Sequence, residues 1–322
     1  MSRPRIVFFG TPAFALPALE RVLTWGAPVA GVVTQPDRPR GRGQHVSAGA
    51  VKRFAVARGL PVLQPERLRD DAFIAAFTAL RAELAVVAAY GKILPEALLA
   101  LPRLGFINVH ASLLPRYRGA SPVQRAVMAG DTETGVSIMR IVRELDAGPV
   151  FASAPHPIGP DDTADQVERA LADLGAALLI DVIEQLADGR ARETAQDSSL
   201  ATFAPRLTPD DGPIDWTWPA KRIHDHVRGL HPWPHACTYA GGKRVILLRT
   251  SLAAALPPAA PGARTREPGE VLAAAGGVLT VVCGDGRALQ LDVLQPEGRR
   301  PMTAREYMAG RRLQPGQRFT GR

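Results

Sequence analysis

Three polar side chains have the types and spacing needed to catalyse attack on a carbonyl carbon with transfer of a proton. Asn108 and His110 lie two residues apart in the run GFINVH, and Asp146 follows a second apolar run. Residues two apart on a strand point to the same side. An imidazole transfers protons near neutral pH, an amide stabilises an oxygen that gains negative charge, and a carboxylate orients the imidazole. Together they suit the attack of an amine on an acyl carbon.

The residues alone leave a second interpretation open, in which Asn108 and Asp146 cap turns and His110 is a surface histidine. The hypothesis of a catalytic set depends on the elements around these residues. If the run that ends at His110 is a strand of an open parallel sheet, its carboxyl end lies at the edge where such sheets bind ligands. The two interpretations therefore differ in whether the three side chains meet.

The first half of the chain alternates short β-rich runs with longer helical patterns, which predicts strand–helix–strand units. Helices are predicted over 13–24, 48–58, 70–81 and 123–129, and a long helix over 164–187 follows from apolar residues at three- and four-residue spacing. The predicted strands are 5–9, 29–34, 61–63, 84–89, 105–110 and 135–141. This pattern predicts an α/β fold with a doubly wound, mostly parallel, Rossmann-like sheet.

After Gly189 the pattern changes, and residues 190–205 are polar and irregular. A helix is predicted over 220–229, and residues 253–264, rich in Ala and Pro, are expected to form a long loop. Strands separated by glycine turns are predicted over 236–239, 244–248, 269–273, 278–283 and 288–293, which is typical of a small antiparallel, OB-like barrel. We therefore expect a catalytic domain over 1–189, a linker over 190–208 and a barrel domain over 209–322.

The composition of the chain excludes several classes of protein. The chain has 322 residues, of which 46% are hydrophobic, enough for two cores and against global disorder. Its two cysteines, Cys237 and Cys283, exclude a disulfide scaffold and a four-cysteine zinc site and suggest a reducing cytoplasm. No apolar run is long enough for a signal peptide or membrane span. The net charge is +8, with most of the excess in 191–322, which favours a nucleic-acid partner over a membrane; a general solubility charge is the alternative.

Three other motifs lack residues that the phosphate-binding, dinucleotide-binding or metal-binding patterns require. GlyThrPro at 10–12 lies where a phosphate loop would but lacks the Gly-Lys-Ser/Thr ending, which disfavours nucleotide hydrolysis. Gly41 and Gly43 lie in a Pro/Arg-rich loop without the third glycine of a dinucleotide fingerprint. The four histidines 224, 226, 231 and 235 invite a metal hypothesis, but prolines separate the last two and no carboxylate motif surrounds them, so we expect packing and no metal.

Seven segments together carry a resemblance to a known family. They are FFGTP, TQPDRPRGRGQ, AAYGKILP, NVHASLLPRYRGASP, ELDAGP, IDW and HPWP. With these segments the chain resembles the methionyl-tRNA formyltransferase family over nearly its whole length. The resemblance implies transfer of the formyl group of 10-formyltetrahydrofolate to the amino group of methionine on initiator tRNA. It also implies that Asn108 stabilises the oxyanion, His110 transfers the proton and Asp146 is the partner of His110.

The resemblance further implies sites for the two substrates. The folate donor would contact Ser112, Leu113, Leu114 and Pro115, and the backbone around Tyr90, Gly91 and Ile93. The arginine-rich loop of Arg38, Arg40 and Arg42 would enter the acceptor-stem groove, with a solvated surface loop as the alternative. Further basic residues would bind the tRNA backbone: Lys221, Arg222, Lys243, Arg244 and Arg249. We expect a cytoplasmic monomer.

Three other functions compete with this hypothesis. The same chemistry could serve an amino-sugar nucleotide or glycinamide ribonucleotide, although a small acceptor needs neither a basic barrel nor an arginine loop. The chain could be an RNA-binding protein with an idle formyltransferase domain, which an intact Asn108, His110 and Asp146 disfavours. An NAD-linked oxidoreductase would need the missing glycine fingerprint.

Overall fold

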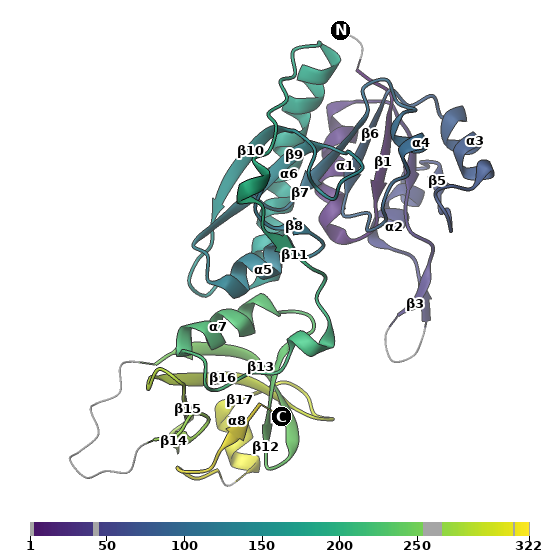
Figure 1. Ribbon diagram of the computed structural model, residues 1–322. Helices are drawn as coiled ribbons and strands as arrows, with labels where there is room; N and C mark the ends of the chain where they lie inside the picture. Colours follow the sequence, from purple (N-terminus) through teal and green to yellow (C-terminus); the bar gives the residue numbers. More distant parts are fainter. Residues whose placement is uncertain (1–2, 41–44, 254–265, 312, 322) are drawn as a thin grey trace. The chain divides into compact units, whose positions relative to one another are not determined.

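The computed structural model describes residues 3–40, 45–253, 266–311 and 313–321. The chain divides into two compact units (Figure 1). The first unit comprises 1–122, 133–157 and 168–205, and the second comprises 123–132, 158–167 and 206–322. Arg42, the Gly41 and Gly43 pair, and nearly all of the predicted loop 253–264 lie outside the described residues. In the part of the chain that is described, no helix is long and apolar enough to cross a membrane.

The first unit contains a seven-stranded mixed sheet in the order β10-β9-β7-β6-β1-β2-β5. The five strands from β7 to β5 pair in parallel, whereas β9 and β10 are antiparallel to their neighbours. The strands are β1 (Ile6–Gly10), β2 (Val29–Val33), β5 (Val62–Leu63), β6 (Leu84–Ala88), β7 (Phe106–His110), β9 (Glu133–Arg140) and β10 (Val150–Pro157). The predicted doubly wound, mostly parallel sheet is confirmed.

Helices cover both faces of this sheet because its central strands are apolar on both sides. On β1, Ile6 and Phe8 enter one core, and Val7 and Phe9 enter the other. The first core also takes side chains from α1 (Leu16–Trp25), α2 (Ala50–Ala57) and α6 (Ala164–Ala187). The second core takes them from α3 (Asp71–Ala79) and α4 (Glu96–Leu99). A short 3-10 helix, η1 (Ala13–Ala15), precedes α1.

Several elements were not predicted from the sequence. The edge strand β10 contains Pro155 and Pro157, residues that argue against a strand, and its alternate residues are exposed. Two further pairs of short strands are β3 (Arg38–Arg40) with β4 (His45–Ser47) and β8 (Arg118–Gly119) with β11 (Phe203–Ala204). Residues 190–205, expected to be irregular, pack in the first unit and include η2 (Ser198–Leu200) besides β11.

The second unit is a curled antiparallel sheet in the order β14-β15-β16-β13-β12-β18. Its two edge strands are linked at one end, because Val271 N–H donates to Gln317 O and Phe319 N–H donates to Gly269 O, each at 2.8 Å. The prediction of a small antiparallel barrel is confirmed as this half-barrel. The strands are β12 (Ala236–Ala240), β13 (Lys243–Leu252), β14 (Val271–Ala275), β15 (Val278–Val282), β16 (Ala288–Pro296), β17 (Met302–Thr303), which pairs with β16, and β18 (Phe319–Thr320).

Helices complete the core of the second unit. Ile223 and Val227 of α7 (Ala220–Gly229) and Tyr307 of α8 (Ala304–Gly310) are buried among the strands. The unit also contains η3 (Pro209–Asp211) and nearly all of α5 (Pro122–Ala129). Cys237 and Cys283 are free thiols and are buried, at 3% and 1% exposure.

Candidate active site

The imidazole of His110 and the carboxylate of Asp146 lie together at the carboxyl end of β7. His110 Nδ1 is 3.7 Å from Asp146 Oδ2, and the two side chains are only 6% and 16% exposed. The other ring nitrogen, Nε2, donates to the carbonyl of Tyr117 at 3.0 Å. With its hydrogen on Nε2, a neutral His110 keeps a lone pair on Nδ1. A proton that arrives at Nδ1 therefore sits next to a carboxylate.

Asn108 lies two residues before His110 on β7, on the same face of the strand. It is paired across the sheet with Val87 of β6 and Met139 of β9, and it is half-buried. The intervening Val109 enters the opposite core. Within the residues that the structure describes, the Asn108 amide has no hydrogen-bond partner, so its N–H groups are available to a ligand.

The turn after β7 is fixed by serine hydroxyls. The buried Ser112 donates through Oγ to Arg116 O at 2.6 Å. Ser137 of β9 donates to Ser112 O at 2.8 Å and accepts from Leu114 N–H at 3.2 Å. Further along this turn Tyr117 has φ +60°, an uncommon conformation that aims its carbonyl at His110. The residues predicted to contact folate, 112–115, are therefore held rigidly beside the imidazole.

Asp146 reaches His110 by a route that the sequence did not predict. Because β9 is antiparallel to β7, its end at Arg140 lies beside Ile107, at the opposite end of β7 from Ser137, which pairs with His110. The turn 141–149 must therefore fold back to bring the carboxylate to the imidazole. Asp146 has φ +47°, and a Cβ at Gly148 would lie 1.9 Å from Arg140 O, so only glycine fits there.

Backbone groups hold the Asp146 carboxylate in this position. Gly119 N–H donates to Asp146 Oδ2 at 2.8 Å, the same oxygen that faces His110. Gly119 has φ +127°, and a Cβ there would lie 2.6 Å from the carbonyl of Ala204. One carboxylate oxygen is thus shared between a backbone donor and the imidazole.

The second predicted folate segment follows β6. The Tyr90 side chain is 2% exposed and packs against Phe9 with ring centroids 5.3 Å apart, and burial raises the pKa of its hydroxyl to about 12. Only backbone at Tyr90 remains for a ligand, and its carbonyl already accepts from Gln35 at 2.7 Å. Gly91 is exposed, and Ile93 is exposed by 85%, which is unusual for a large apolar residue.

A basic cavity of about 690 Å³ opens next to Ile93. Its lining includes one acidic residue, Glu96, and four cations: Arg67, Arg69, Lys92 and Arg143. The ammonium of Lys92 donates to the carbonyls of Pro65 and Glu66 at 2.9 and 2.8 Å and so holds the cavity wall. The three arginines are exposed, and the cavity therefore suits an anionic group.

The basic residues predicted to bind tRNA occupy different environments. Arg38 is exposed and Arg40 lies in β3, whereas Arg42 is outside the described residues. Lys243 and Arg249 are exposed on β13, and Arg244 is half-buried. The exposed Lys221 forms an ion pair with Asp225 at 2.7 Å, and the guanidinium of Arg222 lies over the Trp218 ring at 4.1 Å.

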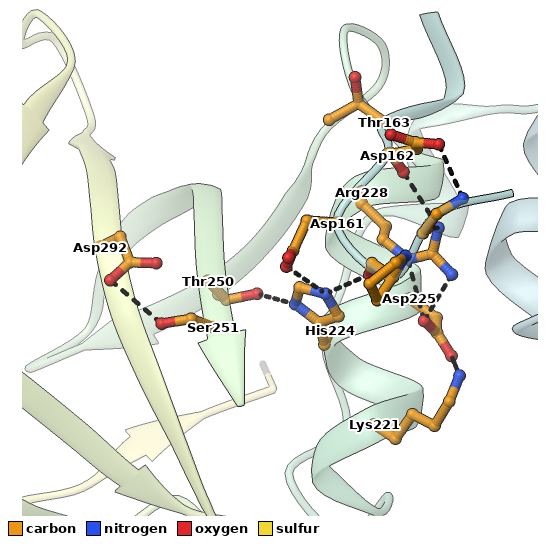
Figure 2. A network of polar contacts seen from close by, with 12 residues as sticks. Asp161, Asp162, Thr163, Lys221, His224, Asp225, Arg228, Thr250, Ser251 and Asp292 are labelled. Atoms are coloured by element: carbon orange, nitrogen blue, oxygen red, sulfur yellow. Dashed lines mark hydrogen bonds and ion pairs between the residues drawn. The ribbon is translucent and has the colours of Figure 1, made fainter. Parts of the chain in front are cut away.

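His224, the first of the four histidines, belongs to a network of polar contacts in the second unit (Figure 2). His224 contacts Thr250 Oγ1 and Pro160 O, each at 3.0 Å, so both ring nitrogens have oxygen partners. The buried Arg228 donates to Asp225 Oδ1 at 2.9 Å and to Asp162 O at 3.0 Å. Among the described residues no group of three or more His, Cys, Asp or Glu could hold a metal ion.

His226 lies in the core beside the network, with its ring edge-on to Trp218 at 5.2 Å. Burial lowers the pKa of His226 to about 4. His231 and His235 lie against each other with ring centroids 5.4 Å apart, and His231 Nε2 is 3.9 Å from Asp165. The expectation that these histidines pack at the domain edge agrees with their contacts.

Sequence reasoning missed the groups that hold the catalytic side chains. They are the Tyr117 carbonyl, the Gly119 N–H, the Ser137 hydroxyl and the Gln196 amide, which donates to Asp146 O at 2.8 Å. Three of these act through backbone atoms or a residue on a neighbouring strand, so no residue type marks them. The one available signal for these groups was Gly119 in the segment YRGA, because this glycine follows two bulky residues inside a turn.

Comparison with known proteins shows the family to which the chain is similar. Residues 4–183 match the formyl transferase family and residues 206–312 match the C-terminal domain of formyl transferases. A methionyl-tRNA formyltransferase of Sorangium cellulosum is 45% identical over 313 residues, covering 97% of this chain and 98% of that protein.

Two solved structures share the fold. A sugar 3N-formyl transferase, WlaRD, determined with dTDP and 5-N-formyl-THF, has a TM-score of 0.65 at 16% identity and covers 93% of this chain and 100% of its own. The methionyl-tRNA formyltransferase from Clostridium thermocellum has a TM-score of 0.53 at 16% identity and covers 78% of this chain and 94% of its own.

The chain therefore belongs to the formyl transferase family. Relatives that are 45% identical over nearly the full length include the methionyl-tRNA formyltransferases of Sorangium cellulosum and Heliobacterium modesticaldum, and the chain is a member of that group. This confirms the resemblance given by the seven sequence segments.

Proposed function

We propose that the protein transfers the formyl group of 10-formyltetrahydrofolate to the amino group of methionine on initiator Met-tRNA, which gives N-formylmethionyl-tRNA. The observation that carries the proposal is the His110–Asp146 contact beside the Asn108 amide, which has no hydrogen-bond partner among the described residues, in a chain of the methionyl-tRNA formyltransferase group. The methionine nitrogen bonds to the formyl carbon, the carbon–N10 bond of the folate breaks, and one proton moves from the attacking nitrogen to N10.

Each of the three side chains has a task in this reaction. Asn108 donates to the formyl oxygen as it becomes negative in the tetrahedral intermediate. His110 receives the proton of the attacking amine at Nδ1 and returns it to the departing folate nitrogen. Asp146, 3.7 Å from Nδ1, balances the charge that His110 carries between these two steps. No step of this scheme requires a metal ion.

The folate donor would lie between the two segments that follow β6 and β7. The pterin would contact the backbone at Tyr90, Gly91 and Ile93 and the rigid turn 112–115. Folates end in a glutamate, and the basic cavity next to Ile93 offers arginines to its carboxylates. We therefore expect Arg69→Ala to raise the KM for the folate donor several-fold with little change in kcat.

The acceptor would be held by the predicted basic residues: Arg38, Arg40, Arg42, Lys221, Arg222, Lys243, Arg244 and Arg249. Binding through phosphates makes affinity for tRNA fall steeply as salt rises. Lys221 already forms an ion pair with Asp225, so we expect it to contribute less to tRNA binding than the exposed Lys243 and Arg249. The cytoplasmic, monomeric state that we expect agrees with this role.

The experiment that tests the proposal incubates the protein with labelled 10-formyltetrahydrofolate and Met-tRNA and follows label on the methionine amine. A dTDP-amino sugar and glycinamide ribonucleotide serve as competing acceptors. Blocked methionine supports the proposal. Label on either small acceptor, with none on Met-tRNA, contradicts the acceptor, and label on no acceptor contradicts the activity.

A further inference from the structure

Residues 193–204, here called the strap, join the two turns that hold the catalytic pair. At one end, Thr194 and Val150 exchange two backbone hydrogen bonds of 2.9 Å, and Glu193 pairs with Arg140. At the other end, β11 pairs with β8, which contains Gly119, the donor to the Asp146 carboxylate. The strap thus contacts both the turn that holds Asp146 and the turn that holds Tyr117.

Gln196 lies within the strap and uses its whole amide. Its Nε2 donates to Asp146 O at 2.8 Å and to Gly148 O at 2.7 Å. Its Oε1 accepts from Arg118 Nε at 3.1 Å and from Arg118 Nη2 at 2.9 Å. Arg118 is buried, with 7% exposure, and lies between Tyr117 and Gly119. One side chain therefore ties the backbone of Asp146 to the turn that faces His110.

The contacts of Gln196 matter because Asp146 does not lie at the end of a strand next to the His110 imidazole. The turn 141–149 folds back from β9, and Asp146 adopts an uncommon positive φ. A residue in such a conformation persists only where surrounding contacts determine it. The two donations from Gln196 are made to carbonyls on either side of Ala147, so they fix the peptide units that set the direction of the Asp146 side chain.

We propose that Gln196 is a positioning residue for formyl transfer, acting through the backbone of Asp146; this inference rests on the proposed function. Gln196 has no contact with His110 in the described residues and is not itself a catalytic residue. Its removal should let the Asp146 carboxylate drift from His110, and misplacement by about 1 Å can cost on the order of 100-fold in rate.

The first test is the kinetics of Gln196→Ala and Gln196→Glu. We expect kcat to fall about 10- to 100-fold in both, with KM for both substrates nearly unchanged. The glutamate keeps the size and the acceptor for Arg118 but cannot donate to the two carbonyls, so it isolates the donor half of the amide. Ser198→Ala is the matched control, because Ser198 is an exposed polar residue of the same strap, and this variant should match the wild type.

A double-mutant cycle separates positioning from general stability. In an Asp146→Ala background, Gln196→Ala should cause no further loss of kcat, since the carboxylate that it positions is absent. If the double variant loses kcat by the product of the two single losses, the proposal is overturned. A wild-type kcat in either Gln196 variant would also overturn it. Thermal unfolding of every variant shows whether a loss of activity comes from a loss of fold.

Hydrogen exchange of the Gly119 amide gives a readout that needs no activity. This N–H donates to the Asp146 carboxylate, so its exchange should become faster in Gln196→Ala and stay unchanged in Ser198→Ala. Unchanged protection in Gln196→Ala would contradict the inference. If the wild type transfers no formyl group, the proposed function fails, and the exchange measurement still decides whether Gln196 positions Asp146.

Discussion

In the described part of the chain, the clusters around His224 and around His110 both combine a buried histidine with acidic residues, and they differ in the contacts that their polar atoms make. Around His224, both ring nitrogens have oxygen partners at 3.0 Å, and Asp225 accepts from both Arg228 and Lys221 (Figure 2). Around His110, Nδ1 and the Asp146 carboxylate are 3.7 Å apart, beyond a hydrogen bond, and the Asn108 amide is unpartnered among the described residues.

The backbone conformation also differs between the two clusters. Tyr117 and Asp146 have positive φ, whereas His224, Asp225 and Arg228 lie on one regular helix. Polar groups without hydrogen-bond partners that are held by uncommon backbone angles indicate a site that receives a ligand. The satisfied contacts of His224, Asp225 and Arg228 on one helix indicate packing, although the buried Nε2 of His226 on that helix has no hydrogen-bond partner among the described residues. Burial and residue type alone do not separate the two.

The most direct test of this comparison replaces each of the two histidines with alanine. We expect His110→Ala to lower kcat about 1000-fold, because it removes the proton-transfer group, while binding of folate and tRNA persists. His224→Ala should keep a kcat within a few-fold of the wild type and lower thermal stability instead. Both are measured by steady-state formyl transfer and thermal unfolding. Comparable losses of kcat in the two variants would erase the distinction.

A second prediction concerns the ion pair of α7. Arg228→Ala leaves the Asp225 carboxylate buried and removes the donor to Asp162 O, so the free energy of unfolding should fall by about 3 kcal/mol. Lys221→Ala removes a partner whose side chain is 59% exposed and should cost less than about 1 kcal/mol. Chemical denaturation measures both. Equal costs would show that the buried pair is not the stabilising element.

A third prediction concerns a pH dependence of stability from His226. Its pKa in the folded protein is about 4, below the ordinary value of 6.5, because burial disfavours the charged ring. The unfolded chain therefore binds a proton first, and stability falls as the pH drops from 6.5 to 4, by at most about 1.4 kcal/mol per pH unit from this group. His226→Gln should reduce the dependence of the unfolding free energy on pH across that window. An unchanged slope in His226→Gln would contradict the assignment.

The sequence predicted the parts of the fold that periodic patterns encode. The apolar spacing over 164–187 predicted α6 with its observed bounds, and the central strands were predicted to within a residue or two. The strand β10 and the helix α8 were missed. The first is a proline-containing edge, and the second is short, although a capping box of Thr303 and Glu306 marks its start.

The site was predictable only in its reacting groups. Asn108 and His110 follow from residue type and strand period, and Asp146 was chosen for its type, but the turn that brings it to His110 depends on an antiparallel strand that the sequence did not reveal. Gln196 lies 50 residues from Asp146 in a polar segment, and its contacts are with backbone carbonyls. Such contacts leave no pattern in the residue types of either segment.

The most direct measurement of the central claim is a single-turnover transfer of labelled formyl from 10-formyltetrahydrofolate to Met-tRNA by the wild type, Asn108→Ala and His110→Ala, with folate binding measured in parallel. We predict that the wild type blocks the methionine amine, that Asn108→Ala slows transfer about 100- to 1000-fold, and that His110→Ala nearly abolishes it, while all three bind folate. Transfer at the wild-type rate in either variant would contradict the account.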